Sequence, residues 1–160
     1  MTGPLFGVAL AAAVLCGLSS GVLFAFSAFV MPALDRLDPG ASVSAMQAIN
    51  VRAVTPPFMV ALLGGGLLCV VLLVVALSDR GAGPSPWLAA GAAFYLVGVL
   101  GLTIGRHVPM NDALATFDAH GPDAAARWAD YSGRWTPLNH VRAATGAIAT
   151  GLLIVGMTAG

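Results

Sequence analysis

Four long apolar stretches dominate this sequence and restrict what it can fold into. They cover residues 5–30, 57–77, 86–105 and 141–157, and each approaches the ~20 residues that a helix needs to cross ~30 Å of hydrocarbon. A segment in lipid must satisfy its own backbone polar groups, as an α-helix does. With 58% hydrophobic and 9% charged residues, the chain has few polar side chains to cover a water-soluble core. The sequence predicts an all-α, four-transmembrane-helix bundle, formed by residues 1–160 as one integral membrane domain.

The connections between these stretches differ in length and composition. Residues 78–85 are rich in Gly and Pro and predict a tight turn. Residues 31–55 contain, at 42–54, apolar side chains at helical spacing, which predicts a short amphipathic helix at the membrane interface. Residues 106–136 are interrupted by a His-Gly-Pro sequence, with Asp123 as a suitable N-cap after it, and predict two short surface helices.

The charges are few and unevenly placed. All seven basic residues are Arg, all seven acidic residues are Asp, and the formal net charge is zero, so no basic surface predicts a nucleic-acid partner. Six arginines fall on the side of the first and third connections, and only Arg80 falls in the middle connection. The positive-inside rule then predicts a cell-membrane protein whose first and third connections are cytoplasmic, with membrane lipids as its surrounding partners.

The second and fourth apolar stretches begin alike but differ in polarity. One begins with TPPFM and the other with TPLNH, so Asn139 and His140 stand where the first half has Phe58 and Met59. Pro in the first turn of a helix costs no hydrogen bond, and Thr before it suits the N-cap. A helix can therefore begin this way without an amide or an imidazole, which indicates a role for these two side chains beyond the scaffold.

Helical geometry predicts which way the polar side chains of the fourth stretch face. With about 100° per residue and His140 as the origin, Asn139 lies at about 260° and Arg142 at about 200°. Val141, at about 100°, marks the side that faces lipid. Asn139 is thus predicted to point into the bundle, with His140 and Arg142 on either side of it. In the third stretch the same construction places His107 opposite a row of glycines and leaves its direction open.

Two polar motifs stand near the ends of the third and fourth stretches: HVPMN at 107–111 and TPLNHVR at 136–142. Each places a His and an Asn close to a Pro. Ionisable groups near membrane depth are costly and often functional. We therefore predict that the polar side chains of both motifs converge on one pocket between the third and fourth helices.

The sequence VPMNDAL, the pattern W…NHVR and the four-span layout resemble those of a family of small four-helix membrane proteins that includes the anthrone oxygenases of polyketide pathways. The resemblance covers nearly the whole chain. It points to residues in the two motifs and directly beside them, namely Pro109, Asn111, Trp135, Asn139, His140 and Arg142.

This resemblance implies oxidation of a hydrophobic polycyclic aromatic ketone by O₂, without an organic cofactor. An anthrone loses a proton from a methylene group between aromatic rings, and the resulting carbanion reacts with O₂ to give a quinone. A neutral imidazole is a suitable base, and Arg and Asn can hydrogen-bond the developing enolate oxygen. The expected catalytic residues are His140 as base, Arg142 and Asn139 as oxyanion donors, and His107 on the opposite wall; the expected substrate-binding residues are Trp135, Asn111, Arg106 and Arg134.

Two other interpretations are open at this point. In the first, His107 and His140 ligate copper, iron or a haem, and Asp112 or Asp130 completes the ligand set. In the second, the polar residues cap helices and bind lipid headgroups, and the chain is a non-enzymatic membrane subunit or a binder of small molecules. A homo-oligomer is compatible with each interpretation.

Overall fold

A computed structural model describes residues 3–78 and 86–159, and every regular element in these ranges is helical. In chain order the elements are α1 (Pro4–Ala25), η1 (Phe26–Val30), α2 (Met31–Leu34), α3 (Pro39–Ala53), α4 (Pro56–Met59), η2 (Val60–Gly64), α5 (Gly65–Ser78), α6 (Pro86–Phe94), η3 (Tyr95–Gly101), η4 (Thr103–His107), α7 (Val108–Ala115) and α8 (Ala124–Thr158). The η segments are π-helical turns that continue the neighbouring α-helices without a break.

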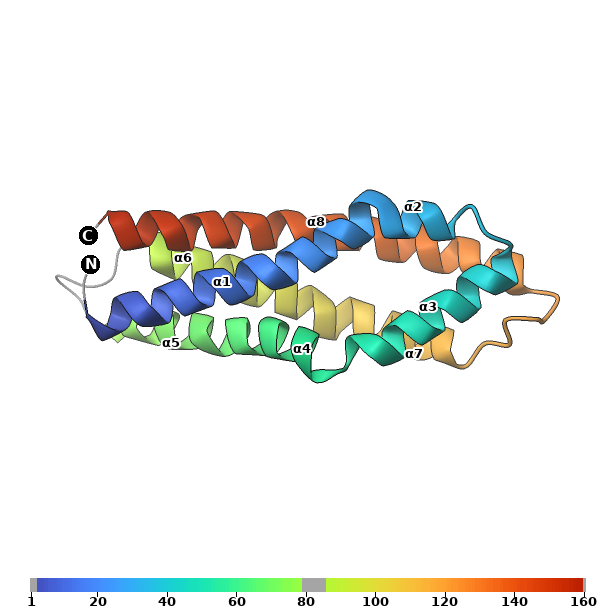
Figure 1. Cartoon of the computed structure of the whole chain (residues 1–160), viewed down its shortest axis with the longest axis horizontal. Coiled ribbons are helices and arrows are strands. Elements are labelled where there is room, and N and C mark those ends of the chain that lie inside the picture. Colours follow the sequence, from blue (N-terminus) through green and yellow to red (C-terminus); the bar gives the residue numbers. More distant parts are fainter. Residues whose placement is uncertain (1–2, 79–85, 160) are drawn as a thin grey trace.

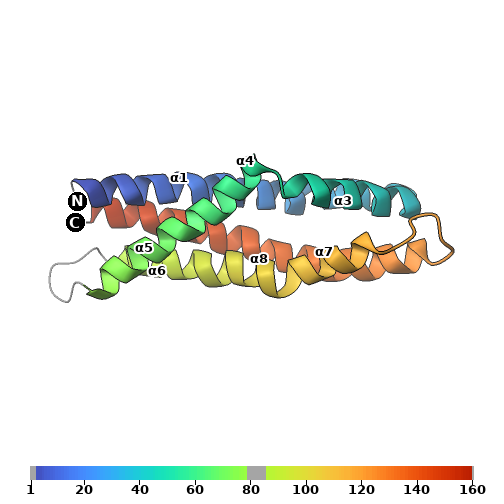
Figure 2. The same cartoon turned by 90° about the horizontal axis from the view of Figure 1, so that it is seen from below.

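All of these elements except α3 join into four long helices, as predicted. They cover Pro4–Leu34, Pro56–Ser78, Pro86–Ala115 and Ala124–Thr158, and each is long and apolar enough to cross a membrane. α1 and α8 pack side by side, α6 packs on α8, and α5 contacts both α1 and α6 (Figures 1 and 2). The predicted class, an all-α bundle of membrane-spanning helices, is confirmed.

The third connection is much shorter than predicted. α7 ends at Ala115 and α8 begins at Ala124, so only residues 116–123 link them. The two short helices predicted within 106–136 exist, but they are the continuous ends of the third and fourth helices and not separate surface helices. Asp123 occupies the predicted N-cap position of α8, although its side chain forms no capping hydrogen bond there.

Pro137 lies inside α8 and does not begin a helix, contrary to the prediction. A Pro removes one backbone hydrogen bond and bends a helix, but packing on both sides can hold the helix together. Here Trp135 and Asn139, on either side of Pro137, are both buried. The Thr-Pro pair begins a helix only in the first half, where Thr55 is the N-cap of α4 and Pro56 its first residue.

The fourth helix is far longer than a bilayer is thick. Its 35 residues span about 52 Å at 1.5 Å per residue, against ~30 Å of hydrocarbon. The excess belongs to an extension at one end of the bundle, where α3 and α7 pack against the first half of α8 and α2 lies alongside (Figure 1). The helix predicted at 42–54 is confirmed as α3, and it packs on this extension against α7 and α8.

Hydrogen bonds from α3 fix it to its neighbours. Ser42 Oγ donates to the Leu34 carbonyl at 2.7 Å, and Gln47 Nε2 donates to the carbonyls of Leu114 and Phe117 at 2.9 Å each. These carbonyls lie at, or just beyond, the ends of α2 and α7. Those of Leu34 and Leu114 also accept backbone N–H groups at 3.1 Å each, so the side chains of α3 add second hydrogen bonds that tie α3 to these helix ends.

The buried apolar side chains form two cores, one in the spanning part and one in the extension. On α8 the border falls between Trp135, which belongs to the extension core, and Ala143, which belongs to the spanning core. Asn139 and Arg142 are buried on α8 between these two positions. Two of the polar side chains that the sequence singles out, Asn139 and Arg142, thus lie where the two cores meet.

Two π-helical turns in the third helix decide the direction of His107. A π-helical turn holds more residues than an α-helical turn, so each residue advances by less than 100°. Over η3 and η4 this lag accumulates, and His107 is buried in the interior. Gly91 and Gly98 also face α8, whereas a regular α-helix would place His107 on the side opposite to them.

The layout predicts which engineered cysteines react from the same side of a membrane. α1 begins and α8 ends at one end of the molecule, and the connections before α3 and α8 lie at the other end (Figure 1). Cysteines placed at exposed Ala159 and exposed His120 should react with an impermeant thiol reagent from opposite sides, His120→Cys from the cytoplasm. The native Cys16 and Cys69 are buried and should contribute little. Reaction of both engineered cysteines from one side contradicts the layout.

Close packing at Gly91 predicts a difference between two helical glycines. A Cβ at Gly91 would lie 3.0 Å from the Ala149 carbonyl oxygen and 3.1 Å from Leu153 Cγ, so Gly91→Ala should destabilise the fold by about 1–3 kcal/mol through overpacking. A Cβ at Gly151 meets nothing within 4 Å, so Gly151→Ala should be neutral or slightly stabilising. Thermal unfolding in detergent measures both, and equal midpoints would rule out the close contact of α6 with α8.

Candidate active site

A cavity of about 520 Å³ lies at the border between the two cores. This volume is within the roughly 300–1,000 Å³ of small-molecule sites. All four long helices and α3 contribute to its wall, which is mostly apolar. The lining includes Leu23, Phe26, Ile49, Asn50, Arg52, Phe58, Met59, Thr103, His107, Asn111, Trp135 and Arg142.

His107 reaches the cavity from the last turn of η4 and is 1% exposed. Its Nδ1 lies 3.2 Å from the Leu102 carbonyl oxygen. Because a carbonyl can only accept, Nδ1 must carry the proton in this contact, and Nε2 of the neutral ring keeps its lone pair. Nε2 is buried and forms no hydrogen bond of ordinary geometry within the described residues, although the Trp135 backbone lies close to the ring.

Arg142 reaches the same cavity from α8 and is 4% exposed. Its Nε is buried without a hydrogen-bond partner, and in residues 3–78 and 86–159 no carboxylate forms an ion pair with its guanidinium. A buried charge without a partner is costly in any protein interior and more so in a membrane. Such a cation can bind an anion, or it can stabilise negative charge that develops on a bound ligand.

An aromatic wall faces the two polar groups. The Trp135 and His107 rings meet edge to face, with centroids 5.0 Å apart. Asn111 Oδ1 accepts hydrogen bonds from Trp135 Nε1 at 3.1 Å and from the Tyr131 hydroxyl at 2.8 Å. Asn111 therefore fixes the orientation of both rings, and the Phe26 ring packs against Trp135 at 5.7 Å on another side.

Asn139 points into the bundle as predicted, and it is fully buried. Its Nδ2 donates to the Leu23 carbonyl at 2.8 Å and to Ser27 Oγ at 2.9 Å. An amide nitrogen has two protons, so both are committed to α1 and η1. Asn139 thus joins α8 to the first helix and has no proton left for the oxyanion role expected of it.

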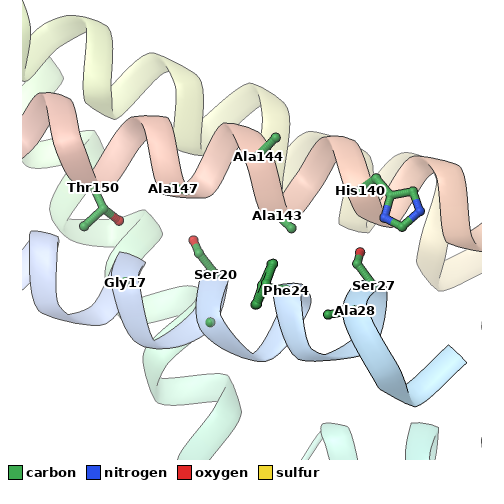
Figure 3. A pocket seen from close by; sticks show the side chains of 11 residues that line it. Gly17, Ser20, Phe24, Ser27, Ala28, His140, Ala143, Ala144, Ala147 and Thr150 are labelled. Atoms are coloured by element: carbon green, nitrogen blue, oxygen red, sulfur yellow. The ribbon is translucent and has the colours of Figure 1, made fainter. Parts of the chain in front are cut away.

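His140 lies outside the cavity that contains His107. It is exposed and lines a separate, mostly apolar groove of about 650 Å³ between α1 and α8. Figure 3 shows its ring near Ser27 and Ala28 at one end of that groove. The expectation that both histidines share one pocket is therefore wrong, because the face of α8 that contains Asn139 and Arg142 packs inward and turns His140 away from it.

Arg106 and Arg134 do not reach His107 either. Both are exposed and line a third hollow, between α7 and α8. Arg134 Nη1 forms an ion pair with Asp130 Oδ2 at 3.2 Å. Their placement thus gives no support to the expected contact with a substrate in the cavity, because η4 carries Arg106, and α8 carries Arg134, on an exposed side.

The metal interpretation requires several ligand side chains that lie close enough to bind one ion. The described part of the chain contains no group of three His, Cys, Asp or Glu side chains close enough to hold one ion. His107 and His140 line different cavities, so neither of these cavities contains both rings.

The sequence analysis did not predict three residues that lie in or beside the cavity, namely Tyr131, Asn50 and Phe26. Tyr131 stands four residues before Trp135 on one continuous helix, so the i, i+4 spacing would have placed both rings on one face. Both residues fall within the short helix predicted after Asp123, which was expected at the surface, so Tyr131 was not assigned to a pocket. Asn50 and Phe26 come from α3 and η1, and no local pattern indicates that these segments meet α8.

The fold and the cavity together define a class: a four-helix membrane protein with a buried polar pair, His107 and Arg142, in an apolar, aromatic-lined cavity. The chain belongs to the anthrone oxygenase family, whose model matches residues 45–152. The match extends from α3 through most of α8 and so includes both members of the pair. Comparison with curated proteins and with solved structures gives no match.

Proposed function

We propose that this protein oxidises a hydrophobic, polycyclic aromatic ketone of the anthrone type with O₂, inside the 520 Å³ cavity. One observation carries the proposal: His107 Nε2 and Arg142 Nε are both buried without partners beside the same apolar cavity. Removal of a proton from a carbon next to a carbonyl requires a base and a hydrogen-bond donor of this kind. Membership of the anthrone oxygenase family agrees with this chemistry.

In the proposed reaction, His107 takes the role that the sequence suggested for His140. Its Nε2 removes one methylene proton, and the electron pair left behind is shared with the ketone oxygen as an enolate. The Arg142 guanidinium stabilises the negative charge on that oxygen. O₂ accepts electrons from the carbanion and forms a hydroperoxide, which loses water to give the second carbonyl. The balance is one CH₂ and one O₂ consumed for one C=O and one H₂O formed.

The rest of the cavity positions the substrate. A flat polycyclic ring can pack against Trp135, whose orientation Asn111 fixes by the 3.1 Å hydrogen bond. The apolar wall excludes water, which strengthens the interaction between Arg142 and the enolate. Because the carbanion itself reduces O₂, the proposed reaction needs no metal or organic cofactor.

Oxygen uptake by the purified protein in nanodiscs tests the proposal. A panel of anthrone-like ketones should contain members that are consumed with one O₂ per quinone formed. An analogue with two methyl groups in place of the methylene protons is the matched control and should not react, because it has no proton to lose. Absence of turnover with every protonated ketone in the panel, in protein shown to be folded, would count against the proposal.

A further inference from the structure

The third hollow, which Arg106 and Arg134 line, lies between α7 and α8, apart from the proposed active site. It is called the arginine groove here and has a volume of about 560 Å³; Arg106, Arg127, Arg134, Asp130, Met110 and Leu138 are among its lining residues. It shares no lining residue with the cavity of His107. Whatever it binds is therefore separate from the proposed oxidation.

The groove has an excess of positive charge. Three of its lining residues are arginines and only Asp130 is acidic. Asp130 is paired with Arg134, and the Arg127 guanidinium lies over the Phe117 ring, 4.4 Å from its centroid. Within the ranges that the structure describes, neither Arg106 nor Arg127 forms an ion pair with a carboxylate. Two guanidinium groups are thus available to an anion.

The position of the groove indicates which kind of anion fits. Arg106 directly follows the apolar stretch 86–105, and Leu138 precedes the apolar stretch 141–157, so one end of the groove lies at the expected membrane boundary. From there it runs along the extension, and Met110 and Leu114 give it an apolar floor. A ligand with a charged head and an apolar body matches both features.

We propose that the arginine groove binds a phosphate group, and that an anionic phospholipid at the membrane boundary supplies it. The planar guanidinium can donate two parallel hydrogen bonds to phosphate oxygens. Basic pockets between helices at a membrane surface bind acidic headgroups for the same reason. The Phe117 contact holds Arg127 at the groove wall, which lowers the entropy lost on binding.

Lipid binding to the intact protein tests this site. Native mass spectrometry after titration with phosphatidylglycerol or phosphatidylcholine should show selective retention of phosphatidylglycerol. Arg106→Gln and Arg127→Gln should each weaken that binding roughly fivefold, the usual effect of one arginine near an anionic surface. Arg36→Gln is the matched control: Arg36 is exposed at the end of α2, so the same change of net charge should leave the affinity unchanged.

A second arm separates the two sources of phosphate. Inorganic phosphate, added to the protein in detergent, should compete only weakly with the lipid for the groove. Phosphatidylglycerol should raise the unfolding temperature of the protein, and inorganic phosphate should not. Stabilisation by inorganic phosphate alone would assign the groove to a free phosphate ion and overturn the lipid source. Equal affinity in wild type, Arg106→Gln and Arg127→Gln, or an equal loss in Arg36→Gln, would overturn the site itself.

Discussion

His107→Asn should lower the rate of substrate oxidation by roughly 10²–10⁴, the usual contribution of a positioned base, while the protein remains folded. The Asn amide nitrogen can take the place of Nδ1 and keep the hydrogen bond that His107 donates to the Leu102 carbonyl at 3.2 Å in the native protein. It has no basic nitrogen at the position of Nε2. The substitution therefore removes the base and preserves the local structure. O₂ uptake with the best ketone of the panel measures the rate.

Two other histidines provide the controls for this variant. His140→Asn tests the residue that sequence reasoning favours as base; because His140 lines a different groove, the rate should change little. His120→Asn alters an exposed residue of the third connection and should have no effect. A strong loss in His140→Asn together with normal turnover in His107→Asn would reverse the assignment and show that His140 is the base.

Arg142→Met should separate activity from stability. Loss of the guanidinium should slow oxidation by roughly 10²–10³, the cost of removing one oxyanion donor. The unfolding free energy should rise by about 1–3 kcal/mol, because a buried charge at membrane depth is replaced by an apolar chain of similar length. Thermal unfolding and O₂ uptake on the same preparation measure both quantities.

Arg142→Met is expected to lower activity and to raise stability, a combination that general damage to the fold would not produce. Arg142→Lys keeps the charge but loses the planar fork, so its activity should lie between wild type and Arg142→Met. Arg36→Met, at an exposed position, is the control and should change neither quantity appreciably. A fall in stability in Arg142→Met would mean that the guanidinium holds the fold together through contacts of its own, and the oxyanion role would then lose its support.

The sequence alone determined the four spans, because ~20-residue apolar stretches in a chain with 9% charged residues have no alternative but helices in lipid. It also determined that α3 exists and that Asn139 points inward, since both follow from the 3.6-residue period of a single helix. Local periodicity could not set the boundaries of the third connection. Pro109 and Pro137 are compatible with helix ends, yet here both lie within continuous helices.

Only the tertiary structure decided which histidine belongs to the site. The direction of His107 depends on two π-helical segments, η3 and η4, which no residue pattern in the sequence predicts. Tertiary packing also brings the thiols of Cys16 and Cys69, 53 residues apart, to 3.7 Å, and it places Tyr131 and Phe26 around Trp135. These contacts join segments that are distant in the chain, so their geometry follows from how whole helices pack against one another and is not encoded in any short stretch of sequence.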